Sequence, residues 1–190
     1  MNRRVAFFVL LLAALLVLGG GLVFFFGFGK KVSLPGLGGG TANPETVGEE
    51  FPVTLYFPGD NGLLVPERRT LRATADPKDR IAKIVAAILA GPEQDDLVRP
   101  FPEGTEVGAV EVTAGGAAYI DLRSATLPDP PAAGSTGEMQ MVYSIVHSVA
   151  MNVEQAPRVA LLWNGVQRLS FGGHLDTSRP LYPDRSLLAP

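Results

Sequence analysis

The sequence predicts an α+β domain: a largely antiparallel sheet with two helices on one face, preceded by an N-terminal transmembrane helix. Residues 5–28 are uncharged and almost wholly apolar. The segments that follow alternate in the order β-β-α-β-β-α-β-β, so that each helical segment stands between two pairs of strands. Helices that alternate with strand pairs in this way commonly cover one face of an antiparallel sheet.

The N-terminal segment is long enough to cross a membrane. Residues 1–4 form a short basic tip, and at about 1.5 Å per residue the apolar residues 5–28 span about 36 Å as a helix. A cleaved signal peptide is the alternative, but its apolar region is usually only about 7–15 residues long. We therefore expect a signal anchor with a cytoplasmic tip and an extracytoplasmic domain, although Lys30 and Lys31 at the other end weaken this orientation.

The remaining chain divides by composition into three parts. Residues 29–50 contain the run GLGGG and few apolar residues, which is typical of a flexible linker with an r.m.s. reach of about 26 Å. Residues 51–182 carry the strand and helix patterns, and residues 183–190 are expected as a C-terminal tail.

The first pair of strands is predicted at 51–58 and 63–73, around the turn sequence PGDNG. In the first strand, Val53, Leu55 and Phe57 alternate with polar or amphipathic neighbours. The second strand contains Arg68, Arg69 and Arg72. These arginines either form a patch for an anionic partner or protect a sheet edge from unwanted pairing, and we favour edge protection.

The first helix is predicted between Asp76, which can cap its N-terminus, and Gly91, which can end it. Pro77 suits the first helical position. The apolar residues recur at helical spacing and form one stripe, which consists of Ile81, Ile84, Val85, Ile88 and Leu89.

The second helix is predicted to begin at Ser135, which can form a capping box with Glu138. Its buried stripe is expected at Val142, Ile145, Val146 and Val149, and its outward face at Gln140, Ser144, His147 and Met151.

The other strands are predicted at 106–112 and 117–122, before this helix, and at 158–163 and 166–171, after it. The last two strands flank Asn164-Gly165, a strong hairpin-turn signal.

Composition excludes several kinds of function. The chain has no cysteine, which removes thiolate metal sites, cysteine nucleophiles and a lipidated cysteine. Beyond residue 31 it has 12 basic and 19 acidic residues, an excess of acid that disfavours nucleic-acid binding. We expect no metal and no cofactor.

Few residues suggest catalysis. His174 and Asp176 alternate along an extended segment and could form a triad with Ser170, or act together with Tyr143. No G-x-S-x-G motif is present to support such a site. A cell-envelope hydrolase or a ligand-binding sensor that uses the His174/Asp176 region is therefore the alternative hypothesis, and we expect no enzyme activity.

Several short motifs come in a recognisable order: VTLYF at 53–57, LLVPE at 63–67, ILAGP at 88–92, FPEGT at 101–105, AYIDL at 118–122, VYSI at 142–145 and NG at 164–165. Together they resemble the GerMN domain, the sporulation and spore germination module of Gram-positive bacteria. The resemblance covers roughly residues 51–182. It implies a non-enzymatic α+β module similar to the ring-building motifs of envelope-spanning assemblies, with no catalytic residues to carry over.

The function expected from the sequence is an interaction or scaffold module at the cell membrane, anchored by residues 5–28. Its partners would be cell-envelope proteins or further copies of the chain, in sporulation or germination. The candidate interaction residues are Arg68, Arg69, Arg72, Gln140, His147 and Met151.

Overall fold

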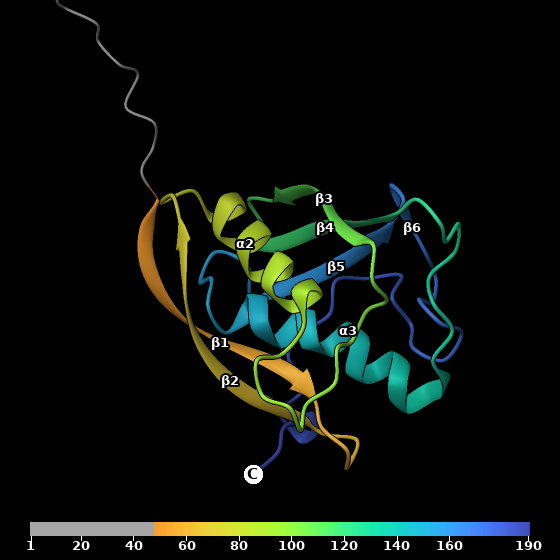
Figure 1. Ribbon diagram of the computed structural model, residues 1–190. Coiled ribbons are helices and arrows are strands. Elements are labelled where there is room, and N and C mark those ends of the chain that lie inside the picture. The colour runs from red at the N-terminus through yellow and green to blue at the C-terminus, as the bar shows by residue number, and fades with distance from the viewer. Residues whose placement is uncertain (1–47) are drawn as a thin grey trace, which may run out of the picture. The chain divides into compact units, whose positions relative to one another are not determined.

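The computed structural model describes residues 48–190, which form two sheets and two α-helices (Figure 1). The predicted transmembrane helix at 5–28 and nearly all of the linker lie outside the described residues. None of the helices within 48–190 has both the length and the apolar character that a membrane crossing requires. The elements are β1 (Glu49–Pro58), β2 (Leu64–Ala73), α2 (Pro77–Ala90), β3 (Thr105–Val112), β4 (Ala117–Ser124), α3 (Gly134–Ala150), β5 (Arg158–Trp163), β6 (Val166–Gln167) and the 3-10 helix η1 (Arg185–Leu187).

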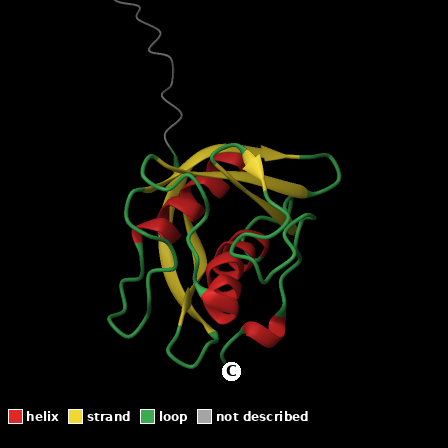
Figure 2. Cartoon of the chain, turned by 90° about the vertical axis from the view of Figure 1, so that its right-hand side faces the viewer, coloured by secondary structure: helices red, strands yellow, loops and turns green. Residues whose placement is uncertain are grey.

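The α+β class is confirmed, but the expected single sheet is wrong. Strands β1 and β2 form a separate two-stranded hairpin, and the second sheet has the order β3-β4-β5-β6. Each helix contacts strands of both sheets, so the helices lie between the hairpin and the larger sheet (Figures 1 and 2). The split follows from the helices themselves, because α3 buries side chains on more than one face and needs a covering layer on each.

The larger sheet also departs from a purely antiparallel arrangement. Strand β4 pairs in parallel with β5, whereas β3–β4 and β5–β6 are antiparallel. The chain between β4 and β5 contains α3, and a helical crossover of this length allows two strands to run in the same direction.

Helix α2 agrees with the sequence prediction at both ends and along its buried stripe. The side chain of Asp76 accepts a hydrogen bond from the Lys78 backbone N–H, and Pro77 occupies the first turn. Gly91 ends the helix with φ 97°, a value that favours glycine. All five predicted stripe residues are buried in a core that includes side chains from both sheets.

Helix α3 differs from its prediction in two ways. Its N-cap is Ala133, without a side-chain cap, so the Ser135–Glu138 capping box is wrong. The Glu138 side chain instead accepts hydrogen bonds from the 170–174 segment. The outward face is also wrong for Ser144 and His147, which are fully buried because the face of α3 that they occupy is covered.

The C-terminal part of the chain is tied to the domain rather than extended as a strand. The return strand predicted at 166–171 is only the two-residue β6, because the chain beyond it turns to bind Glu138. Further along, Leu181 forms a bridge with Val159 of β5, and the Ala189 N–H donates to the Leu64 carbonyl at 2.8 Å. Residues 183–190 therefore contact the domain, and η1 lies within them.

Candidate functional site

The β1–β2 hairpin presents an inner face to the helices and an outer face to solvent. On β2 the side chains of Leu71 and Ala73 are partly or fully buried, whereas Arg68, Thr70 and Arg72 are exposed. This alternation is the period of two expected for a strand with one covered face. Arg69 stands between Arg68 and Thr70 in the sequence and so falls on the opposite, inner face. The three predicted arginines therefore do not form a single patch.

Arg69 belongs to the inner face. Its guanidinium pairs with the buried Glu67 carboxylate, lies over the Phe57 ring and donates to the Gly91 carbonyl at 2.8 Å. Glu67 also accepts hydrogen bonds from the backbone N–H groups of Glu93 and Gln94, at 2.9 and 3.0 Å. This cluster joins β2 to the C-terminal end of α2 and is a structural contact rather than a docking surface.

Burial by itself raises the pKa of the Glu67 carboxyl. The hydrogen bonds from Arg69 and from the backbone N–H groups of Gln94 and Glu93 outweigh that effect, with the Arg69 charge adding to them, and leave the pKa below its ordinary value. Glu67 therefore remains ionised near neutral pH, and the pair keeps its charge-assisted hydrogen bonds.

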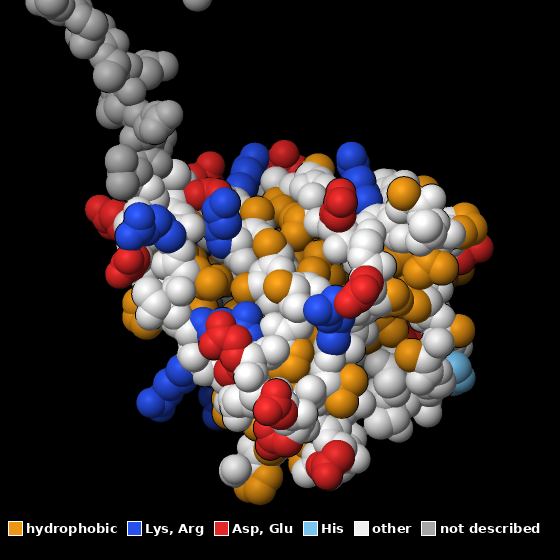
Figure 3. All heavy atoms as spheres, viewed as in Figure 1, with side chains coloured by type: hydrophobic (Ala, Val, Ile, Leu, Met, Phe, Trp, Pro, Cys, Tyr) orange, Lys and Arg blue, Asp and Glu red, His pale blue; other side chains and the backbone are white. Residues whose placement is uncertain are grey.

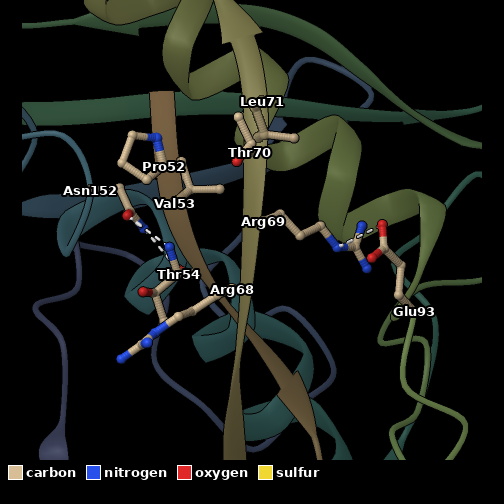
Figure 4. A pocket seen from close by; sticks show the side chains of 9 residues that line it. All are labelled: Pro52, Val53, Thr54, Arg68, Arg69, Thr70, Leu71, Glu93 and Asn152. Atoms are coloured by element: carbon tan, nitrogen blue, oxygen red, sulfur yellow. Dashed lines mark hydrogen bonds and ion pairs between the residues drawn. The ribbon is translucent and has the colours of Figure 1, made fainter. Parts of the chain in front are cut away.

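Arg68 and Arg72 occupy the outer face. Arg68 makes no ion pair with any residue in 48–190, and Arg72 pairs only with Glu50, where both side chains are 64% exposed. A shallow hollow on the hairpin is lined by residues of both strands together with Glu93 and Asn152 (Figure 4). In this view Arg68 extends toward Thr54, whereas Arg69 extends away from it toward Glu93.

The outer edge of β1 is bound by other parts of the domain at three positions. The Asn152 side chain accepts from the Thr54 N–H at 3.0 Å and donates to the Thr54 carbonyl at 2.8 Å, in the manner of a neighbouring strand. Ser148 Oγ accepts from the Tyr56 N–H at 2.9 Å. The Val98 N–H donates to the Pro58 carbonyl at 2.9 Å. These contacts seal the β1 edge at positions 54, 56 and 58.

The same contacts fix which backbone groups of β2 point away from the hairpin. Thr54 lies opposite Arg68, and both hydrogen-bonding groups of Thr54 point away from β2. In an antiparallel pair, the two facing residues then both direct their N–H and C=O groups outward. The alternation places the groups of Thr70 and Arg72 outward as well, opposite Pro52 and Glu50.

Residues 48–190 leave the outer edge of β2 largely unoccupied. At one end the Leu64 carbonyl accepts from the Ala189 N–H. Beyond it, Pro66 has no N–H, and no residue in 48–190 forms a hydrogen bond with the outward backbone groups of Arg68, Thr70 or Arg72. We call residues 66–72 the β2 edge. The domain therefore presents a row of unsatisfied strand groups beside two exposed arginines.

The predicted interaction residues on α3 have mainly structural contacts. Gln140 Nε2 donates to the Gly59 carbonyl at 3.0 Å and so supports the hairpin turn. His147 is fully buried, with its ring nitrogens 3.0 Å from the carbonyl oxygens of Tyr143 and Asp184. Burial lowers the pKa of His147, although both carbonyl contacts oppose that shift. Met151, at the C-cap, is 49% exposed.

The residues of the catalytic hypothesis do not assemble as expected. His174 Nδ1 lies 3.2 Å from the buried Glu138 carboxylate, and Ser170 Oγ donates to the same carboxylate at 3.0 Å. Asp176 accepts from the Ser178 N–H and hydroxyl within its own turn. Tyr143 instead lies beside His147. The alternative triad is therefore not formed, because His174 and Ser170 both contact Glu138 and Asp176 binds Ser178.

Glu138 is a structural anchor that sequence reasoning missed. It also accepts from the backbone N–H groups of Gly172 and His174, at 2.5 and 2.7 Å. Burial raises its pKa, but these hydrogen bonds and that of Ser170 outweigh burial and keep the pKa below its ordinary value. No group of three or more metal-ligating side chains within 48–190 could hold an ion.

Asn152 and Ser148 were also missed. Their partners on β1 lie 98 and 92 residues away along the chain, so no local pattern could have indicated the contacts. Ser148 also lies at helical spacing beside the predicted outward residues Ser144 and Met151, so periodicity gave no signal that it is buried.

Comparison with known families gives a match over most of the domain. The Germane family model, described as sporulation and spore germination, matches residues 54–169, which is more than half of the chain. No curated protein matches the sequence.

Solved structures agree at the level of the fold. The first GerMN domain of the sporulation protein GerM from Bacillus subtilis is 18% identical, with a TM-score of 0.52 over 72% of this chain and 98% of that one. The tandem GerMN domains of the same protein give 18% and 0.50 over 70% of this chain, which spans only 46% of their length. A protein described as a lipoprotein from Clostridium perfringens gives 19% and 0.51 over 70% and 87% of the two chains.

Proposed function

The chain belongs to the GerMN family of sporulation and spore germination proteins, and we propose that it is a membrane-anchored interaction module of the cell envelope. In this proposal residues 5–28 anchor the chain and residues 29–50 allow the domain to reach a partner near the membrane surface. The domain supports the assembly of an envelope complex in sporulation or germination.

The observation that carries the proposal is the asymmetry of the hairpin. One of its edges is bound at positions 54, 56 and 58 by contacts within the domain, and the other carries outward backbone groups beside Arg68 and Arg72. Unpaired strand edges are surfaces on which other chains dock.

The charge distribution supports a protein partner. On the face seen in Figure 3, acidic and basic side chains are interspersed, with apolar side chains between them. A nucleic-acid partner would favour clustered lysine and arginine instead. The proposal therefore includes no nucleic acid, no cofactor and no enzymatic step.

The anchoring half of the proposal can be tested by labelling. The chain has no cysteine, so a single Asn61→Cys substitution in the exposed hairpin turn gives a unique target. A membrane-impermeant maleimide should label this variant in intact cells, whereas an Asn2→Cys control at the predicted cytoplasmic tip should react only after lysis. Labelling of Asn61→Cys only after lysis would contradict an extracytoplasmic domain.

The interaction half needs a site-specific test. A photo-crosslinking amino acid at Thr70, on the β2 edge, should give a discrete protein adduct in the native host at the stage when the chain is expressed. The same group at Glu106, an exposed position on β3, serves as the control. Adducts that are equal at both positions, or none at either, would count against an interaction module that uses the hairpin.

A further inference from the structure

The backbone groups and the two arginines of the β2 edge indicate what kind of partner it binds. We infer that the β2 edge binds an extended acidic segment of a partner protein, which adds to the hairpin as a third strand. This inference rests on the proposed function and specifies its surface and the chemistry of its partner. In strand addition, main-chain hydrogen bonds provide the affinity. Side-chain contacts at alternate positions provide the specificity.

The backbone of the β2 edge supplies the hydrogen bonds. Arg68, Thr70 and Arg72 each direct an N–H and a C=O outward, and Pro66 adds a carbonyl. At about 3.3 Å per residue, the edge extends for roughly 20 Å, a length that suits an incoming strand of six or seven residues. Pro66 limits pairing at one end, and the contact between Leu64 and Ala189 closes the strand beyond it.

The side chains on the outer face select acidic residues. A third strand would place its own outer side chains directly beside Arg68 and Arg72, within reach of both guanidinium groups. Arg68 has no ion-pair partner in the described part of the chain, and the Arg72–Glu50 pair is exposed and therefore easily exchanged. Arg68 and Arg72 are four residues apart on the same face of β2. The residues of the incoming segment that lie opposite them are therefore also four apart, and the segment should carry Asp or Glu at positions i and i+4.

A second copy of the chain fits this edge poorly. Two β2 edges paired antiparallel about Thr70 would place Arg68 of each copy opposite Arg72 of the other. Like charges directly opposite one another destabilise a strand pair. The β1 edge of a second copy offers a poorer surface than an open strand, because Asn152, Ser148 and Val98 already bind its outward groups at positions 54, 56 and 58.

The chain's own linker is equally unsuited to the β2 edge. Residues 29–47 contain Lys30, Lys31, a run of glycines and two prolines, and Glu45 is their only acidic residue. Glycine and proline are disfavoured within strands, and the lysines would face arginines. The charge and backbone chemistry of the β2 edge thus favour an acidic strand from another protein.

The inference can be tested with the full-length chain in detergent micelles and two synthetic peptides. The first is a nine-residue peptide of alternating threonine and valine, with glutamate in place of threonine at its third and seventh positions. The second has lysine at those two positions. The measurement is amide hydrogen exchange at Arg68, Thr70 and Arg72, with and without each peptide.

The glutamate peptide should slow exchange at these three amides by at least tenfold at saturation, and the lysine peptide should leave it unchanged. The variant Arg68→Glu/Arg72→Glu should reverse this preference. Reversal distinguishes charge-selective strand addition from an edge whose arginines only prevent unwanted pairing. The double substitution lies on exposed positions, and the unchanged exchange of Thr54 and Tyr56 would show that the hairpin remains folded.

Three results would overturn the inference: no protection by the glutamate peptide, equal protection by both peptides, or protection of the three amides before any peptide is added. The last would show that the chain itself covers the β2 edge. Failure here is separable from failure of the proposed function. If the peptides fail while Asn61→Cys is labelled from outside and crosslinks form at Thr70, the module stands and only the partner chemistry is wrong.

Discussion

The two edges of the β1–β2 hairpin have the same backbone chemistry but different surroundings. On β1, the side chains of Asn152 and Ser148 and the backbone of Val98 bind both outward groups of Thr54, the N–H of Tyr56 and the carbonyl of Pro58. On β2, no described residue does so between Pro66 and Arg72. Within residues 48–190, the fold therefore uses one edge for its own contacts and leaves the other without hydrogen-bond partners, which is the basis for our functional proposal.

The β2 strand is held from its inner face rather than from its edge. Glu67 and Arg69 attach it to the end of α2, and Phe57 and Leu55 of its partner strand are fully buried. A strand anchored in this way can keep a free edge without detaching from the domain. Removal of the Glu67 side chain should therefore lower the free energy of unfolding, whereas removal of the Arg68 side chain should not.

The largest effect is expected for Glu67→Ala. Glu67 is 4% exposed, and its removal leaves the nearly buried Arg69 guanidinium without its carboxylate and two backbone N–H groups without an acceptor. Breaking a buried ion pair on one side costs about 3–5 kcal/mol. Denaturant unfolding should show this loss. The control is Glu50→Ala, which breaks the exposed pair on the same hairpin and should cost at most about 1 kcal/mol. Similar losses for both would contradict an inner-face anchor.

The same carboxylate should make stability depend on pH. The folded-state pKa of Glu67 lies below its ordinary value, and the unfolded pKa of a glutamate is about 4.3. Its contribution is therefore complete above the unfolded pKa and is lost as the pH falls through the folded pKa. The stability difference between the natural chain and Glu67→Gln should be constant from pH 7 to about pH 5 and shrink on further acidification. A stability difference that grows on acidification would show that folding raises the pKa of Glu67 and does not lower it.

A smaller loss is expected for Asn152→Ala, which opens the β1 edge. The substitution removes hydrogen bonds to both backbone groups of Thr54 and to the Ser148 carbonyl. At about 0.5–1.5 kcal/mol for each, the expected destabilisation is about 2–3 kcal/mol. The neighbouring exposed residue provides the control, since Met151→Ala should change stability by no more than about 0.5 kcal/mol. Equal effects would mean that the β1 edge is not sealed by Asn152.

The smallest effect is expected for Arg68→Ala. Arg68 is exposed and has no ion-pair partner within residues 48–190, so its loss should change the free energy of unfolding by less than about 0.5 kcal/mol. The same variant should weaken binding of the glutamate peptide to the β2 edge. A destabilisation as large as that of Asn152→Ala would show that Arg68 serves the fold.

The two helices show how far the sequence could predict the fold. Helix α2 was predicted with its cap, its bounds and its buried residues, because it has one apolar stripe and local end signals. Helix α3 was not, because its second buried face is built from Ser144, His147 and Ser148. The hydrophobic periodicity of the sequence predicts that such polar residues are exposed. Only the tertiary structure shows that backbone groups and neighbouring rings surround them.

The candidate surface was predicted only in part. The sequence identified Arg68 and Arg72 as exposed positions on an edge, but it grouped them with Arg69, which points inward. It also indicated a hairpin without showing that the hairpin stands apart from the larger sheet. Which edge is sealed depends on contacts between residues more than 90 positions apart, and these leave no local signal.

Native-state amide hydrogen exchange on the full-length chain can compare the two edges of the hairpin residue by residue. The amides of Thr54 and Tyr56, which are bound by Asn152 and Ser148, should exchange slowly. The amides of Arg68, Thr70 and Arg72 should exchange quickly, although they lie on the adjacent strand. Slow exchange at all five amides would show that the β2 edge is already covered. Fast exchange at all five would show that the β1 edge is not sealed, and either result would contradict the asymmetry on which the account rests.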